Sequence, residues 1–294
     1  MLELDYFVVD VFTTTALAGN PLAVVMNTAG LTTERMQAIA REFNLSETTF
    51  VARRPEAIEQ AEGVRVRIFT TQEELNFAGH PTLGTAAILK FHAPEVMHED
   101  TVTLALNVGP VPVCFAADGL FGEMTQPDPE FGAELDPFEV ARLTGLAQQD
   151  LDPGLPPQIV STGNPFAIVP LRSHEALARL KVNQEEATAW LRQRGARWFY
   201  VLGPACGEEP AWRARMQFYG GEDPATGSAA GPAIAYLVAR GAVVAGKRIH
   251  LRQGVEIGRP SDLFLSAHMD SAKVTHVRVG GSTVVVANGR LFLP

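Results

Sequence analysis

One short sequence occurs twice in this chain of 294 residues, and this repeat constrains the fold more than any other feature. GNPLAVV, residues 19–25, returns 144 positions later as GNPFAIV, residues 163–169. In both copies Gly-Asn-Pro is typical of a turn, and the apolar, β-branched residues that follow favour a strand. A turn followed by a strand is common in proteins, so this match alone leaves coincidence open.

A second pair of matching segments lies at a similar spacing. The Gly-rich stretches FAGHPTLG, residues 77–84, and GGEDPATGSAAG, residues 220–231, each lead into a helix of small apolar residues. Gly84 and Gly231 are 147 positions apart, which is close to the spacing of the first pair. Because both matches keep their order along the chain, we infer an internal duplication.

The two expected helices indicate how each half is built. TAAILKF, residues 85–91, and AAGPAIAYL, residues 229–237, are apolar nearly all round, which is typical of a helix that is buried on every side. Strand patterns surround both segments. We therefore expect an α+β fold with two pseudo-symmetric halves, each a curled, mostly antiparallel sheet around a central helix.

The half boundaries follow from the same reading. We expect an N-terminal half over residues 1–126 and a C-terminal half over residues 127–282, with a last strand, residues 283–294, that returns to the first half. PDPEF, residues 127–131, carries two prolines and is the expected crossing point. A more ordinary helix, capped by Thr32 or Thr33, should bury one face that includes Met36 and Ile39.

Composition excludes several classes of protein. Apolar residues make up 46% of the chain and charged residues 19%, as in folded globular proteins. The net charge of −9 argues against a sequence-independent grip on nucleic acid. The start lacks the order of a signal peptide, and the late apolar region is interrupted by Gly, Pro and Arg240. We expect a cytoplasmic protein that binds neither nucleic acid nor membranes.

The chain holds two cysteines, Cys114 and Cys206. They are too few and too far apart for a disulfide framework, and neither has the spacing of a metal or redox motif. No Ser–His–Asp order and no metal-ligand cluster is legible either. A metal site is therefore not expected.

The starts of the two buried helices are candidate anion sites. His80-Pro81 would place a proline at the first helical residue, and Thr226, Gly227 and Ser228 would supply small capping residues. The first N–H groups of a helix lack internal partners, and the helix dipole favours an anion there. If the halves face each other, both starts could bind a carboxylate in one shared cleft. The alternative is two ordinary capped helices.

Four side chains near these stretches could carry chemistry. Glu47, in NLSETTFV, follows a helix and precedes an apolar strand, where a carboxyl group partly removed from water suits proton transfer. It could equally be a surface acid of a turn. His80 could hold a substrate group, tune the glutamate, or merely pack at a helix start. Asp223 and Ser228, in GEDPATGSA, could bind a ligand, although Asp before Pro224 is also a common turn residue.

Taken together, these motifs resemble the PhzF family of phenazine-biosynthesis-type isomerases. NLSETTFV, FAGHPTLGTA and EDPATGSAA carry the resemblance, with DVFT and GNPLAVV near the start, and the likeness runs over essentially the whole length. It implies the diaminopimelate epimerase-like fold, in which the site lies between two pseudo-symmetric halves. It would also explain the repeat, because a duplicated half would build each wall of one cleft.

The resemblance also implies roles for single residues. Glu47 would be the general acid/base that takes a proton from one carbon of the substrate and returns it to another. His80 and Asp223 would position the substrate or assist this transfer, and Gly79, Gly227 and Ser228 would bind its carboxylate. The reaction would be the isomerisation of a small carboxylate-bearing metabolite such as trans-2,3-dihydro-3-hydroxyanthranilate, without metal or organic cofactor. The family commonly forms homodimers.

Two other functions stay open. Racemases of the same fold use two facing cysteines, and neither cysteine of this chain lies in a motif, which weighs against that chemistry. An epimerase would need a second acid/base, for which Asp223 is the obvious candidate. The third possibility is a metabolite-binding or regulatory protein that keeps the pocket without turnover.

Overall fold

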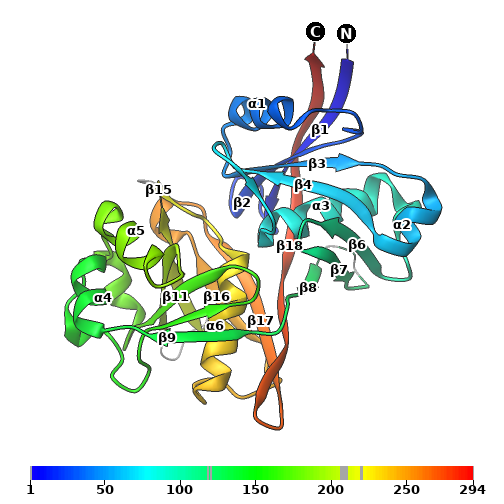
Figure 1. The fold of residues 1–294 in the computed structure, drawn as a ribbon. Coiled ribbons are helices and arrows are strands. Elements are labelled where there is room, and N and C mark those ends of the chain that lie inside the picture. The colour runs from blue at the N-terminus through cyan, green and yellow to red at the C-terminus, as the bar shows by residue number, and fades with distance from the viewer. Residues whose placement is uncertain (1, 118, 120, 206–210, 219–220, 294) are drawn as a thin grey trace. The chain divides into compact units, whose positions relative to one another are not determined.

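The computed structural model describes residues 2–117, 119, 121–205, 211–218 and 221–293, so that Cys206 and Gly220 lie outside the described residues. The chain divides into two compact units (Figure 1). Unit 1 comprises Met1–Thr125 and Gly280–Pro294, and unit 2 comprises Gln126–Val279. Unit 1 is thus built from both ends of the chain.

Unit 1 contains both strands and helices. They are β1 (Leu2–Val11), β2 (Asn20–Val25), α1 (Thr33–Phe43), β3 (Glu47–Ala52), α2 (Glu56–Glu62), β4 (Val64–Phe69), β5 (Glu74–Leu75), α3 (Gly79–His92), the 3₁₀ helix η1 (Pro94–Val96), β6 (Thr101–Leu106), β7 (Gly109–Phe115) and β8 (Phe121–Thr125). The last strand of the chain, β18 (Lys273–Leu293), begins in unit 2 and ends in unit 1.

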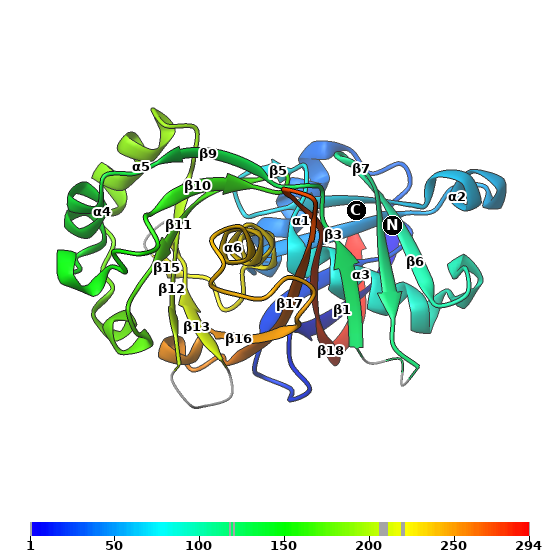
Figure 2. The ribbon, with the colours of Figure 1, turned by 90° about the horizontal axis from the view of Figure 1, so that it is seen from below.

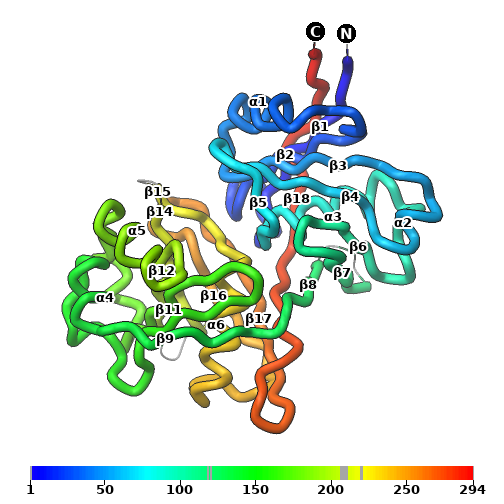
Figure 3. Tube along the Cα trace, viewed as in Figure 1, coloured from blue at the N-terminus to red at the C-terminus, as the bar shows by residue number. Residues whose placement is uncertain are grey.

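The strands of unit 1 close on themselves around α3. Their order is β1-β2-β3-β4-β6-β7-β8-β18, and β18 pairs with β1 again. The β1–β18 pair is antiparallel from Leu2↔Leu293 to Val11↔Thr283, so both chain ends run side by side, as the trace in Figure 3 shows. Eleven of the fourteen residues of α3 are buried. The closed ring of strands explains why this helix is apolar nearly all round.

Unit 2 has a comparable set of elements. They are β9 (Glu130–Glu134), α4 (Pro137–Thr144), η2 (Gln148–Asp150), β10 (Gln158–Ser161), β11 (Pro165–Pro170), η3 (His174–Arg179), α5 (Gln184–Arg192), β12 (Trp198–Pro204), β13 (Trp212–Arg215), β14 (Gln217–Phe218), β15 (Gly221–Glu222), α6 (Gly227–Ala239), β16 (Ile249–Gln253), η4 (Val255–Ile257) and β17 (Ser261–Asp270).

The sheet of unit 2 curls around α6. Its strand order is β18-β17-β16-β13-β12-β11-β10-β9, and α6 packs against β10, β11 and β17. Figure 2 shows α6 end-on with these strands around it. Eleven of its thirteen residues are buried. Within the described part of the chain, no helix is both long and apolar enough to span a membrane.

Both units repeat one order of strand pairings. In unit 1 the pairs β1–β2, β2–β3, β3–β4, β4–β6 and β6–β7 are antiparallel, parallel, antiparallel, parallel and antiparallel. The pairs β10–β11, β11–β12, β12–β13, β13–β16 and β16–β17 of unit 2 follow the same order. The predicted α+β class, with two pseudo-symmetric curled sheets around central helices, is confirmed.

An arginine–glutamate pair also recurs in both units. Arg67 Nε donates to Glu74 Oε1 at 2.8 Å, and Arg215 Nε donates to Glu222 Oε1 at 2.8 Å. In each pair Nη2 donates to the second carboxylate oxygen, which makes the contact bidentate. Each pair ties a strand of the large sheet, β4 or β13, to the two-residue strand, β5 or β15, that precedes the central helix. The two units therefore also match at these arginine–glutamate pairs, although the residues that flank them differ between the units.

Backbone conformation explains why each Gly-Asn-Pro turn begins with glycine. Gly19 has φ +67°, and a Cβ there would lie 2.4 Å from the carbonyl oxygen of Val11. Gly163, in the second copy, has φ +119°. Only glycine accepts these conformations readily. The predicted helix with a threonine cap is confirmed as α1, in which Thr32 Oγ1 accepts from the Arg35 N–H at 3.3 Å.

We expect Gly231→Ala to lower the free energy of unfolding by about 1–3 kcal/mol, although alanine is the better helix former. An added Cβ would lie 1.9 Å from Gln126 Oε1. Gln126 would then lose its hydrogen bonds with Gly227 and Thr162. Urea denaturation measures the change. The control is Gly221→Ala, whose Cβ would meet its nearest neighbour at 3.6 Å; equal stability of both variants would contradict the prediction.

Candidate active site

The starts of three elements meet in unit 1. Glu47 is the first residue of β3, Asn20 is the first residue of β2, and His80 is the second residue of α3. Glu47 Oε2 lies 3.4 Å from His80 Nε2. The His80 side chain is 4% exposed and that of Glu47 is 16% exposed, so the carboxyl group keeps limited access to solvent. The structure therefore brings two of the predicted residues together.

Asn20 orients the imidazole of His80. Its side-chain nitrogen Nδ2 lies 3.1 Å from His80 Nδ1, and both residues are buried. With Asn20 Nδ2 as donor, Nδ1 accepts and the ring proton is on Nε2; the other tautomer requires the reversed Asn20 amide. Nε2 is the ring nitrogen that faces Glu47. Sequence reasoning missed this role, although Asn20 belongs to the repeated Gly-Asn-Pro turn that singled out the segment.

Burial keeps His80 uncharged. It lowers the pKa of His80 from 6.5 to about 3, and the backbone of Pro21 opposes this shift only in part. A charged imidazole loses its hydration in such a place, so the neutral form is favoured. The 3.4 Å contact with Glu47 therefore joins a carboxyl group to a neutral ring that can donate one hydrogen bond.

Close packing fixes the start of α3 beside β2. A Cβ on Gly84 would lie 2.7 Å from Leu22 Cδ2 and 2.8 Å from Val11 Cγ2, so the glycine lets the helix approach both strands. The sequence predicts Pro81 as the first residue of this helix. The helix begins earlier, at Gly79, so that Pro81 is its third residue. A proline is tolerated there because the first four N–H groups of a helix have no intrahelical acceptor.

The start of α6 differs from the expected cap. Thr226 is the N-cap residue, but its side chain makes no capping hydrogen bond. Its hydroxyl donates instead to Asp223 Oδ2 at 2.7 Å. The first intrahelical bond is donated by Ala229, so the N–H groups of Gly227 and Ser228 precede it. Ser228 is half-buried and keeps part of its surface accessible.

Asp223 is anchored from several sides. It is 8% exposed, its N–H donates to the Met216 carbonyl at 2.9 Å, and its own carbonyl accepts from Gln253 Nε2 at 2.8 Å. Gln253 also contacts Thr226. No feature of the sequence singles out Gln253, because the contact spans 30 residues.

The predicted residues thus form two groups, each described within its own unit. Glu47, Gly79 and His80 belong to unit 1, and Asp223, Gly227 and Ser228 belong to unit 2. Among the residues that the structure describes, no cluster of three or more His, Cys, Asp or Glu side chains is placed to hold a metal ion.

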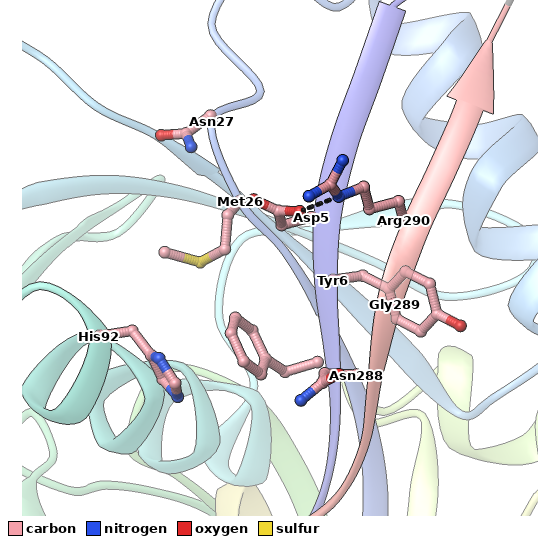
Figure 4. Close-up of a pocket in the computed structure, with 9 residues that line it drawn as sticks. Asp5, Tyr6, Met26, Asn27, His92, Asn288, Gly289 and Arg290 are labelled. Atoms are coloured by element: carbon pink, nitrogen blue, oxygen red, sulfur yellow. Dashed lines mark ion pairs between the residues drawn. The ribbon is translucent and has the colours of Figure 1, made fainter.

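Unit 1 also carries a separate cavity of about 500 Å³ (Figure 4). None of the predicted site residues lines it; its lining residues are Asp5, Tyr6, Phe7, Met26, Asn27, His92, Asn288, Gly289 and Arg290. Arg290 Nε lies 3.4 Å from Asp5 Oδ1, and the arginine is largely exposed. The charge of this pocket is therefore already paired within the chain and screened by solvent.

The neutral state of His80 has a measurable consequence for stability. Its folded pKa of about 3 lies below the 6.5 of an unfolded histidine, so the unfolded chain binds the proton first as the pH falls. The contribution of neutral His80 to the free energy of unfolding is complete above pH 6.5. It is lost as the pH falls from 6.5 to about 3. From pH 6.5 to 4.5, the free energy of unfolding of the wild type should fall more steeply than that of His80→Gln, by about 1 kcal/mol per pH unit.

Urea denaturation at several pH values measures both slopes, and glutamine retains a donor without titrating. Equal slopes would show that the imidazole of the folded protein is protonated over this range. In that case the contact with Glu47 would be a charged pair.

Comparison with known proteins places these motifs in one family. The profile of the phenazine biosynthesis-like protein family, PhzC-PhzF, matches residues 9–289. The chain is 37% identical to the trans-2,3-dihydro-3-hydroxyanthranilate isomerase of Pseudomonas aeruginosa, over 98% of this chain and 99% of that protein. A PhzF-family protein of Bacillus anthracis superposes with a TM-score of 0.86 at 27% identity, over the full length of both chains.

A more distant likeness concerns the fold alone. A hydroxyproline epimerase of Agrobacterium vitis superposes with a TM-score of 0.67 at 14% identity, over 98% of this chain and 92% of that one. The predicted epimerase-like fold is confirmed by this likeness. The profile match over nearly the whole chain and the high identity to a named isomerase agree, and the chain therefore belongs to the PhzF family of isomerases.

Proposed function

We propose that this isomerase moves a proton between two carbons of a small, carboxylate-bearing metabolite, with Glu47 as general acid/base. The observation that supports this most directly is the contact between Glu47 and the buried, neutral His80 at 3.4 Å. The carboxyl group lies at the first residue of a strand, is largely buried, and still keeps some access to a ligand.

The reaction balances without a further reactant. The Glu47 carboxylate takes a proton from one carbon as that C–H bond breaks, and the electron pair shifts through an adjacent double bond. The protonated carboxyl group then returns the proton to another carbon, where a new C–H bond forms. Glu47 ends as the carboxylate with which it began, so one group acts first as base and then as acid.

The neutral ring of His80 suits this double role. A cationic imidazole at this distance would stabilise the carboxylate and oppose its protonation during turnover. A neutral ring adds no such charge, and an N–H on Nε2 would be available to the carboxyl group or to the substrate. His80 is therefore proposed to orient Glu47 or the substrate rather than to carry charge.

The strand pairings support one acid/base rather than two mirrored ones. Leu22 of β2 lies opposite Glu47 of β3 in a parallel pair. Phe166 occupies the place of Leu22 in the second copy of the repeat, and it lies opposite Trp198 of β12. An indole therefore stands in unit 2 at the position that the carboxyl group holds in unit 1.

The helix starts repeat this difference. His80 precedes Gly84 by four positions, and Gly227 precedes Gly231 by four positions in the matching stretch. In this alignment unit 2 has glycine where unit 1 has histidine. Counted from the helix start, the counterpart of His80 is Ser228, which is not a base either. An epimerase with one base in each unit would require a counterpart of Glu47 and His80 in unit 2. The equivalent positions of unit 2 carry no such acid/base pair.

The remaining predicted residues are proposed to bind the substrate. The N–H groups of Gly227 and Ser228 precede the first intrahelical bond of α6, where the helix dipole favours an anion. The half-buried Ser228 hydroxyl adds a donor. Gly79 offers the equivalent position of α3, and Asp223 is proposed to position the substrate. The named activity of the Pseudomonas aeruginosa relative makes trans-2,3-dihydro-3-hydroxyanthranilate the first substrate to test.

We expect Glu47→Gln to lose at least about 100-fold in turnover, because a positioned acid/base contributes about this much or more. Glutamine fills the same space and keeps a polar contact with His80, so ligand affinity should change little. The measurement is consumption of trans-2,3-dihydro-3-hydroxyanthranilate, with incorporation of deuterium at carbon in heavy water as a second readout.

Glu42→Gln is the matched control, because Glu42 is exposed on α1 and lies outside the proposed site. It should retain full turnover. Full turnover of Glu47→Gln would refute its role. Ligand binding by the wild type with neither consumption nor label would favour the metabolite-binding protein. Conversion of a different small carboxylate would keep the mechanism with another substrate.

A further inference from the structure

Gln253 is the centre of a buried hydrogen-bond network in unit 2. It is the last residue of β16 and is fully buried. Its Oε1 accepts from the Tyr200 hydroxyl at 3.0 Å and from the Thr226 N–H at 3.1 Å. Its Nε2 donates to the Asp223 carbonyl at 2.8 Å and to Thr226 Oγ1 at 2.9 Å. All four hydrogen-bonding positions of the amide are used.

These partners fix the orientation of the amide. A backbone carbonyl only accepts and a backbone N–H only donates, so Nε2 must face Asp223 and Oε1 must face the Thr226 N–H. In the flipped amide, Oε1 would face the Asp223 carbonyl oxygen, and Nε2 would face the Thr226 N–H. Neither pair could form a hydrogen bond. Burial then makes the flip costly, because water cannot replace the lost bonds.

The fixed amide in turn fixes the hydroxyl of Thr226. Thr226 Oγ1 already accepts from Gln253, so its single proton is free to donate, and it does so to Asp223 Oδ2 at 2.7 Å. This oxygen of Asp223 is therefore an acceptor. Hydrogen bonds to a carboxylate stabilise its ionised form.

The backbone brings β16 against the Asp223 loop at this point. Gly254 follows Gln253 with φ +78°, and a Cβ there would lie 2.6 Å from the Pro224 carbonyl oxygen. Only a residue without a side chain allows this approach. The register that places Gln253 beneath Asp223 and Thr226 is thus built into the strand end.

We propose that Gln253 is a positioning residue for the reaction: by orienting the Thr226 hydroxyl, it holds Asp223 as a fixed, ionised hydrogen-bond acceptor beside the start of α6. The inference rests on the proposed function, in which Asp223 positions the substrate. A rigid Asp223 carboxylate would accept from an amino or hydroxyl group of that substrate without reorganisation.

The charged neighbours of this network are few. Tyr200, on β12, is fully buried, and burial followed by the charge of Asp223 raises its pKa, so its hydroxyl stays protonated and donates. Glu222 precedes Asp223 in the chain and is neutralised by Arg215 from β13. Glu256, after β16, approaches the same arginine at 4.0 Å. The first turn of α6 carries no acidic residue.

The test compares Thr226→Val, which removes the hydroxyl at nearly constant shape, with Thr226→Ser, which keeps it. The titration of the Asp223 carboxyl carbon is followed by NMR of protein labelled with ¹³C at aspartate carboxyl groups, with Asp223→Asn to assign the signal. The titration midpoint should rise by roughly one pH unit in Thr226→Val, as expected for the loss of one hydrogen bond to a charge. It should stay near the wild-type value in Thr226→Ser.

Gln253→Glu tests the amide itself. A carboxylate there still accepts from Tyr200 and from the Thr226 N–H, but it cannot donate to Thr226, whose hydroxyl is then drawn away from Asp223. The Asp223 midpoint should rise at least as far as in Thr226→Val. Urea denaturation confirms that each variant is folded before its titration is compared.

Turnover supplies a second readout on trans-2,3-dihydro-3-hydroxyanthranilate. The acidic limb of the kcat/KM profile should move to higher pH in Thr226→Val and return in Thr226→Ser. Absence of substrate conversion with the wild type would count against the proposed function, while the NMR titration would still decide on the network. Identical Asp223 midpoints in folded wild type, Thr226→Val and Gln253→Glu would overturn the inference.

Discussion

The burial of a helix that is apolar on every side is the constraint on which the rest of this structure depends. Such a helix must be surrounded, and in both units the sheet curls around it. Its apolar side chains are buried by packing, but its first N–H groups have no hydrogen-bond acceptor within the helix. Polar residues therefore gather where α3 and α6 begin, and the proposed chemistry lies at these two starts and at the strand end that carries Glu47.

The two units use this shared frame differently. The bidentate pairs Arg67–Glu74 and Arg215–Glu222 have the same geometry and stabilise the approach to each helix. The groups beside the helix starts are not shared. Unit 1 has a carboxyl group and a neutral imidazole, whereas unit 2 has an aspartate held by a threonine and a glutamine. Repetition maintains the fold, and departures from repetition supply the polar groups to which we assign the chemistry.

Much of the fold could be predicted from the sequence, because its signals are local. The repeated turns, the two apolar helices and the cap of α1 each need only a few consecutive residues. The partners of the site residues could not be predicted in this way. Asn20 meets His80 across 60 positions and Tyr200 meets Gln253 across 53. The capping role expected for the Thr226 side chain was wrong because its hydroxyl oxygen accepts from Gln253, 27 positions away, rather than from an N–H of the helix.

The path of β18 has a consequence for how the chain folds during synthesis. Unit 2 is one continuous segment, but the ring of unit 1 needs β18, whose final residues pair with the first strand of the chain. On the ribosome, β1 cannot complete its pairing until residues 272 to 291 positions later have been made. The N-terminal region is therefore translated first and completed last, which reverses the usual order of domain folding. Until β18 pairs with it, β1 exposes an unpaired edge that is open to pairing with another chain.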